Sequence, residues 1–193
     1  MDGEVILPHF KVVLLGNTST GKTSLANRWV NNIPTHDLSP TIGNKTMNKE
    51  LTVDGKQIVV MLWDTAGQER YKALIPLYTR SSAAVILIAA VDNQSSIDAL
   101  GDWLQVVKDC CDQGTPVVIG LNKTDLLDHE MDISYMQSIY PEVSAFFLVS
   151  AVTNENVDVM FFKAAELASR NAQGDESAST QQIKIEKDKS GCC

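Results

Sequence analysis

Short apolar runs alternate with segments of helical periodicity along most of the chain. Continuous apolar runs predict buried strands over residues 10–15, 83–91, 116–121 and 145–149. Two further runs, 50–53 and 56–63, flank Asp54-Gly55, a dipeptide that favours a hairpin turn. Three- and four-residue apolar spacing predicts helices over residues 22–30, 97–111 and 157–168. This alternation predicts an α/β fold: a mostly parallel six-stranded sheet with one antiparallel edge strand and helices on both faces.

Composition then sets the extent of the domain. A chain of 193 residues, 44% of them apolar, is long enough for one domain with a sizeable core. From about Ala172 the sequence becomes QGDESASTQQ, which has too little apolar area to offset the entropy of ordering. We therefore expect a domain over residues 1–172 and a flexible tail over residues 173–193.

Charge and hydropathy exclude several classes of function. The net charge of −8 argues against nucleic-acid binding and against a polybasic membrane patch. The start, MDGEVILPHF, has no basic region typical of a signal peptide. The longest apolar run, 83–91, is far below the about 20 residues that a membrane span needs. We therefore expect the chain to reside in the cytosol, and we expect it to act as a monomer.

The first strand runs into a glycine-rich loop that opens a helix. This loop, Gly16-Asn17-Thr18-Ser19-Thr20-Gly21-Lys22-Thr23, matches the pattern GxxxxGK[ST] and is followed by Ser24. Its glycines let successive N–H groups face a phosphate, and the helix start adds positive potential. Lys22 would reach the β- and γ-phosphates, and the Thr23 hydroxyl would ligate Mg²⁺. The loop alone does not distinguish ATP from GTP.

A second motif follows the strand at residues 56–63. Asp64 stands opposite the phosphate loop, where it can hold Mg²⁺ through a water; the alternative is a helix N-cap. Gly67 allows a close backbone approach, so that its N–H could donate to a γ-phosphate. Gln68 could orient an attacking water.

The segment Asn122-Lys123-Thr124-Asp125 follows another strand, at the edge of the sheet where ligands bind. A buried Asp125 carboxylate would accept two hydrogen bonds from guanine and reject adenine, which offers no such donor pair. The alternative is a loop that uses its Asn and Asp only for turns. Ser150-Ala151 could close the base pocket by backbone contact.

Taken together, these segments resemble the Ras superfamily of small GTPases, and WDTAGQERYKALIPLYTR with the terminal double cysteine is similar to the Rab family. The resemblance implies the P-loop GTPase fold, GTP and GDP as ligands, and slow GTP hydrolysis that uses Gln68 and Lys22. It also implies that Thr41 in the first switch ligates Mg²⁺ by its hydroxyl and the γ-phosphate by its N–H. A small-molecule kinase on the same loop would leave the segment 122–125 without a role.

The resemblance also explains Cys192 and Cys193 as sites of geranylgeranylation; the alternative is two unmodified thiols. Two lipid chains anchor a protein stably where one does so only marginally. The implied partners are effectors, an exchange factor, a GTPase-activating protein and a prenyl-carrier chaperone of the GDI type. The implied location is the cytoplasmic face of endomembranes, with a cytosolic pool.

Some positions depart from the family pattern. Pro34 and Leu38 replace aromatic residues of the first switch, and Val152 replaces the lysine that packs on the base. Each loss should weaken nucleotide retention, so we predict fast spontaneous exchange. Thr46 replaces an aromatic of the effector-reading surface, and Thr18 in the phosphate loop could crowd an incoming catalytic residue. The alternative function is therefore a hydrolysis-deficient or fast-exchanging guanine-nucleotide-binding module.

Overall fold

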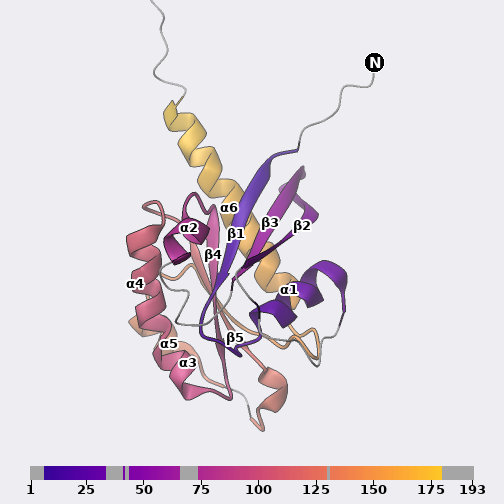
Figure 1. Cartoon of the computed structure of the whole chain (residues 1–193), viewed down its shortest axis with the longest axis vertical. Coiled ribbons are helices and arrows are strands. Elements are labelled where there is room, and N and C mark those ends of the chain that lie inside the picture. Colours follow the sequence, from indigo (N-terminus) through magenta and orange to yellow (C-terminus); the bar gives the residue numbers. More distant parts are fainter. Residues whose placement is uncertain (1–6, 34–40, 42–43, 66–73, 130, 180–193) are drawn as a thin grey trace, which may run out of the picture.

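The computed structural model describes residues 7–33, 41, 44–65, 74–129 and 131–179. Within them, six strands form one sheet: β1 (His9–Leu15), β2 (Asn44–Val53), β3 (Lys56–Thr65), β4 (Ala84–Ala90), β5 (Val117–Asn122) and β6 (Ala145–Leu148). The strand order is β2-β3-β1-β4-β5-β6, and Figure 1 shows β2, β3, β1 and β4 following one another in this order. β2 runs antiparallel to β3, and all other neighbours are parallel. The predicted α/β fold with one antiparallel edge strand is confirmed.

Helices cover both faces of the sheet (Figure 1). They are α1 (Lys22–Asn31), α2 (Ile75–Thr79), α3 (Gln94–Asp98), α4 (Leu100–Cys110), α5 (Ser134–Ile139) and α6 (Val157–Ser179), with a short 3-10 helix at Thr124–Leu126. Successive side chains of β1 point to opposite faces, so Val12 and Leu14 pack with α1 and α6, whereas Val13 and Leu15 pack with α4. The central strands are consequently apolar at almost every position.

The helical segment predicted over 97–111 is two helices. α3 ends at Asp98, α4 begins at Leu100, and Asn93 caps α3 by accepting a hydrogen bond from the Ser96 N–H. The sequence did not predict α2 or α5, because five and six residues are too few to display a helical period. Both short helices instead bury single apolar anchors, Ile75 and Met136, against the sheet.

The two hairpin strands are longer than predicted. β2 begins at Asn44, six residues before the predicted start, and β3 reaches Thr65. The additional part of β2 is polar because its outer face is exposed, and only Met47 within it is buried. Its ladder with β3 runs unbroken from Asn44 opposite Thr65 to Val53 opposite Lys56. This edge strand is therefore held by its backbone ladder more than by apolar burial.

Helix α6 continues to Ser179, beyond the boundary that we expected at residue 172. Extending an existing helix costs little, because each added residue gains a hydrogen bond without a new nucleation step. The first turns of α6 supply the nucleus, since Val157, Met160, Phe161 and Ala164 are buried in the core. The rest of the predicted tail, 180–193, lies outside the described residues. In the part of the chain that the structure describes, no helix combines the length and apolar character that crossing a membrane requires.

An aromatic pair joins α1 to α6 on the face of the sheet that these two helices cover. The rings of Trp29 and Phe161 stack with their centroids 4.4 Å apart and an interplanar angle of 10°. The Lys49 ammonium of β2 lies 4.8 Å from the Trp29 ring centroid and contributes a cation–π contact. The pair therefore links the helix that follows the phosphate loop to the C-terminal helix.

Phe161→Ala is expected to lower the free energy of unfolding by about 3–5 kcal/mol, because it leaves a cavity and removes the stacking partner of Trp29. The neighbouring Phe162 is 44% exposed, against 1% for Phe161. Phe162→Ala is therefore the matched control, with an expected loss below about 1 kcal/mol. Urea denaturation of the two variants measures the difference. Equal losses would contradict this account of the core.

Candidate functional site

Four polar segments meet at the carboxyl edge of the sheet. Asn17 to Thr20 follow β1, Asp64 lies near the end of β3, Asn122 ends β5, and Ser150 follows β6. Because β1, β3, β5 and β6 run in the same direction, their carboxyl ends share one edge. The structure thus brings together segments that are more than 100 residues apart in sequence.

The phosphate loop has a backbone that only glycine allows at two positions. Gly16 has φ 135° and Gly21 has φ 88°. A Cβ at Gly16 would lie 2.1 Å from the Ile88 carbonyl oxygen, and one at Gly21 would lie 2.2 Å from Asn122 Nδ2. No side chain caps the start of α1, so the first-turn N–H groups remain available to an anion. This curled backbone fits a phosphate chain.

Lys22 supplies the positive charge of the site. It is buried, and its Nζ donates to the carbonyl oxygens of Gly16 at 2.9 Å and Asn17 at 2.6 Å. Burial lowers the pKa of Lys22 to about 8, and the nearby Asp64 charge partly opposes that shift. A phosphate beside this amine would favour its charged form. The environment of Lys22 therefore fits an anionic ligand.

Three oxygen-bearing side chains converge beside Lys22. Thr23 Oγ1 donates to Asp64 Oδ2 at 2.6 Å and lies 2.6 Å from Thr41 Oγ1. Asp64 is 0% exposed, and its Oδ1 has no hydrogen-bond partner among the described residues. Burial raises the pKa of Asp64, while the Thr23 hydrogen bond and the charges of Lys22 and Lys45 lower it. Two hydroxyls and a carboxylate with a free oxygen fit Mg²⁺, which prefers oxygen ligands.

The Asn122 side chain connects the two halves of the site. Its Nδ2 donates to the Thr20 carbonyl at 2.9 Å, and its Oδ1 accepts from the Ala151 N–H at 3.2 Å. The next residue, Lys123, has φ 71° and forms an ion pair with Asp92 at 2.9 Å. The phosphate loop and the segment after β6 are thereby held by one amide.

Asp125 and Ser150 form a second connection at this edge. Ser150 Oγ donates to Asp125 Oδ1 at 2.5 Å and accepts from the N–H groups of Val152 and Thr153. The expectation of a buried Asp125 is wrong for the protein alone, because this residue is exposed even though its Oδ1 accepts from the buried Ser150. Discrimination against adenine by an unpaired carboxylate therefore requires the base itself to cover Asp125.

Two residues in the site escaped the sequence analysis. The Arg28 side chain, from the last turn of α1, donates to the carbonyl oxygens of Ala151 and Val152. The Trp103 indole N–H, from α4, donates to Asn17 Oδ1 at 2.8 Å. A tryptophan within a helical segment, such as Trp103, is by its sequence most simply a packing residue. No local pattern identifies either contact.

Several predicted site residues have no described structure. The roles of six residues outside the described ranges remain predictions: Gly67, Gln68, Pro34, Leu38, Cys192 and Cys193. Among the described ones, Thr18 is exposed on the phosphate loop, as crowding of an incoming residue requires. Val152 is 45% exposed.

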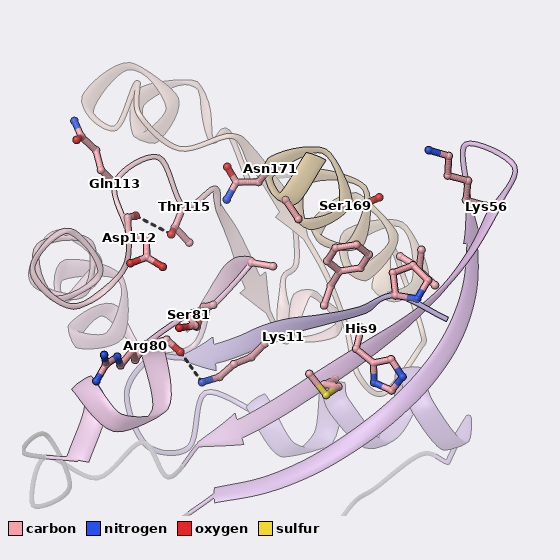
Figure 2. Close-up of a pocket in the computed structure, with 17 residues that line it drawn as sticks. His9, Lys11, Lys56, Arg80, Ser81, Asp112, Gln113, Thr115, Ser169 and Asn171 are labelled. Atoms are coloured by element: carbon pink, nitrogen blue, oxygen red, sulfur yellow. Dashed lines mark hydrogen bonds between the residues drawn. The ribbon is translucent and has the colours of Figure 1, made fainter. Parts of the chain in front are cut away.

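A cavity of about 800 Å³ lies at the other end of the sheet, where the strands begin (Figure 2). Its lining includes Lys11, Lys56, Arg80, Asp112 and Asn171. Within this lining, Lys11 Nζ donates a hydrogen bond to the Arg80 carbonyl oxygen at 2.9 Å (Figure 2). The cavity shares no residue with the four segments described above, so it is separate from the candidate site.

Gly21→Ala is expected to weaken nucleotide binding strongly and to destabilise the domain by at least about 1–2 kcal/mol, because it combines positive φ with a clash against Asn122. Gly101→Ala in α4 is the control, since a Cβ there would meet Tyr140 Oη at an ordinary 3.4 Å. That change should be neutral or raise stability by up to about 1 kcal/mol. Thermal unfolding and nucleotide titration measure both effects. Normal binding by Gly21→Ala would contradict the geometry of the loop.

Comparison with known proteins agrees with this geometry. The Ras family profile matches residues 11–170. The chain is 32% identical to Ras-related protein Rab-9A of Rattus norvegicus, over 95% of this chain and 96% of that protein. It is 33% identical to putative ras-related protein Rab-5B of Dictyostelium discoideum, over 79% and 72%. Against Ras-related protein RabJ of the same organism the identity is 33%, over 84% of this chain and 64% of that protein, slightly under two thirds of its length.

The family match covers the phosphate loop, the oxygen cluster and the segment 122–125, which are the parts of the site that the structure brings together. The chain therefore belongs to the Ras family and is a Rab-type small GTPase, a trafficking switch that binds GTP and GDP with Mg²⁺ and hydrolyses GTP.

Proposed function

We propose that this GTPase is a membrane-anchored switch that recruits effectors on the cytoplasmic face of endomembranes while it holds GTP. The proposal of a switch rests on one observation, the contact of Thr23 with both Thr41 and Asp64. Thr41 belongs to the expected first switch, whereas Thr23 and Asp64 belong to the fixed phosphate site. A ligand that binds this oxygen cluster therefore also determines where the first switch lies.

The nucleotide would lie along the carboxyl edge of the sheet. Its phosphates would contact residues 16–24 and the N–H groups of Thr41 and Gly67, and its base would contact Asn122, Lys123, Asp125 and residues 150–152. Thr23, Thr41 and Asp64 would hold Mg²⁺, which when bound neutralises charge on the β- and γ-phosphates. Support comes from the curled loop backbone and from the free carboxylate oxygen of Asp64.

For hydrolysis, we propose that Gln68 orients the attacking water and that Lys22 stabilises negative charge developing on the phosphates. None of the described arginines is placed to act on the phosphates together with Gln68 and Lys22. Arg28 is buried against residues 151 and 152, Arg170 pairs with Asp54 and Glu166, and Arg80 lies at the opposite end of β1. An activating protein would then supply an arginine, and turnover would be slow without it.

Effector binding would use the exposed side chains of β2 and the partly buried Trp63 of β3. Thr46 lies directly opposite Trp63 in the β2–β3 ladder. On β1, the other neighbour of β3, Lys11 places its Nζ 4.3 Å from the Trp63 ring centroid in a cation–π contact. We therefore propose that a hydroxyl and an ammonium flank Trp63 on this surface, which makes it more polar than a surface with an aromatic residue at position 46.

Asp125→Asn tests the proposed assignment of the base. An amide loses one of the two acceptors for guanine but complements xanthine, whose 2-oxo group accepts a hydrogen bond. We expect GDP affinity to fall about 100-fold or more and xanthosine diphosphate affinity to rise. Asp128→Asn, at an exposed carboxylate three residues on, should change neither. Unchanged GDP binding by Asp125→Asn, in titrations with fluorescent nucleotides, would rule out this base site.

The membrane anchor is tested by the double substitution Cys192→Ser and Cys193→Ser. Together the two lipids should provide nearly all of the membrane adhesion, because one chain alone binds only marginally. We expect the unsubstituted chain in cells to partition between membranes and a cytosolic pool bound to a prenyl-carrier chaperone. The double variant should be wholly cytosolic and carry no prenyl mass. Cys110→Ser, within α4, is the control, and membrane recovery of the double variant would contradict the anchor.

A further inference from the structure

The contact between α1 and the segment after β6 is built from a buried charge. The Arg28 side chain is only 9% exposed, although it belongs to a helix near the surface. Its Nε donates to the Ala151 carbonyl at 2.8 Å, and its Nη2 donates to the Val152 carbonyl at 2.7 Å. Two adjacent donors of one guanidinium thus hold two successive carbonyl groups, a fork that lysine cannot reproduce.

This burial is costly without a compensating interaction. Removing a guanidinium from water is unfavourable unless its donors are well paired. In the described part of the chain, Arg28 forms no ion pair with a carboxylate. The two carbonyl groups, together with the position of Arg28 in the last turn of α1, compensate the charge. The location of this arginine is therefore tied to residues 151 and 152.

The same loop is held on its other side. Asn122 accepts from the Ala151 N–H, and Ser150 joins the loop to Asp125. Arg28 provides the opposing contact, so the backbone of Ala151 is fixed through both its N–H and its C=O. The loop is consequently held by three elements: β5, the 3-10 helix and α1.

We propose that Arg28 is a positioning residue that holds the base-binding loop, residues 150–152, and thereby determines how tightly the protein retains and selects guanine nucleotide. The inference rests on the proposed assignment of this loop to the base. Lys22 begins α1, and Arg28 stands six residues later, about 9 Å along the helix axis. One helix thus connects the phosphate site to the base site. The contact matters more in this chain because Val152 offers the base no long side chain.

Arg28→Met removes the donors but keeps most of the side-chain volume. We expect fluorescent GDP to dissociate at least tenfold faster from it than from the unsubstituted protein, and amide hydrogen exchange to rise at residues 150–153. GDP affinity should fall by a larger factor than ADP affinity, since ADP gains less from this loop. Asn31→Ala, on the exposed end of the same helix, should behave like the unsubstituted protein.

Arg28→Lys keeps the charge but offers its donors from a single nitrogen, so its GDP release should be intermediate. It also provides the measurement if Arg28→Met does not fold. GDP release as slow as in the unsubstituted protein would overturn the inference. So would an equal loss of GDP and ADP affinity, because that result would mean that Arg28 only supports the fold. If the unsubstituted protein itself fails to prefer GDP over ADP, the base site is wrong and the inference fails with it.

Discussion

The hydrogen bonds of the Asn122 amide are the constraint on which the nucleotide site depends. This buried side chain donates to the Thr20 carbonyl and accepts from the Ala151 N–H, while its own backbone carbonyl accepts from the Val91 N–H. The phosphate loop and residues 150–152 are therefore positioned by one residue at the end of β5. Its amide group packs so closely under the phosphate loop that position 21 has no room for a Cβ.

Buried charge is the second organising feature. Burial lowers the pKa of Lys22 and raises that of Asp64, so it disfavours the charged form of both groups. Each group partly offsets the shift of the other through their opposite charges. Phosphates beside Lys22 and a divalent cation beside Asp64 would stabilise the charged forms of both side chains, because each brings the opposite charge close to the buried group. The protein alone thus has a site whose electrostatics favour the nucleotide and the cation together.

Local patterns were sufficient to predict the elements that bury apolar residues and the loops that follow them. The runs ending at Leu15 and Leu121 identified strands, and the motifs directly after them lie at the edge of the sheet where the candidate site is. The contacts of Arg28 and Trp103 were not predictable, because they join residues 123 and 86 positions apart and neither belongs to a recurring local spacing. The extension of α6 to Ser179 was also missed, since composition there disfavours independent folding but not the continuation of a helix already anchored in the core.

The central claim is that the carboxyl edge of this sheet binds guanine nucleotide through the phosphate loop, the oxygen cluster around Thr23 and the loops held by Asn122. Its most direct test is the binding and release of fluorescent GDP and GTP by the purified protein, with and without Mg²⁺ and with ATP as competitor. We predict guanine-nucleotide binding that ATP does not displace and that weakens when Mg²⁺ is removed. Binding that ATP displaces, or that is indifferent to Mg²⁺, would contradict the account.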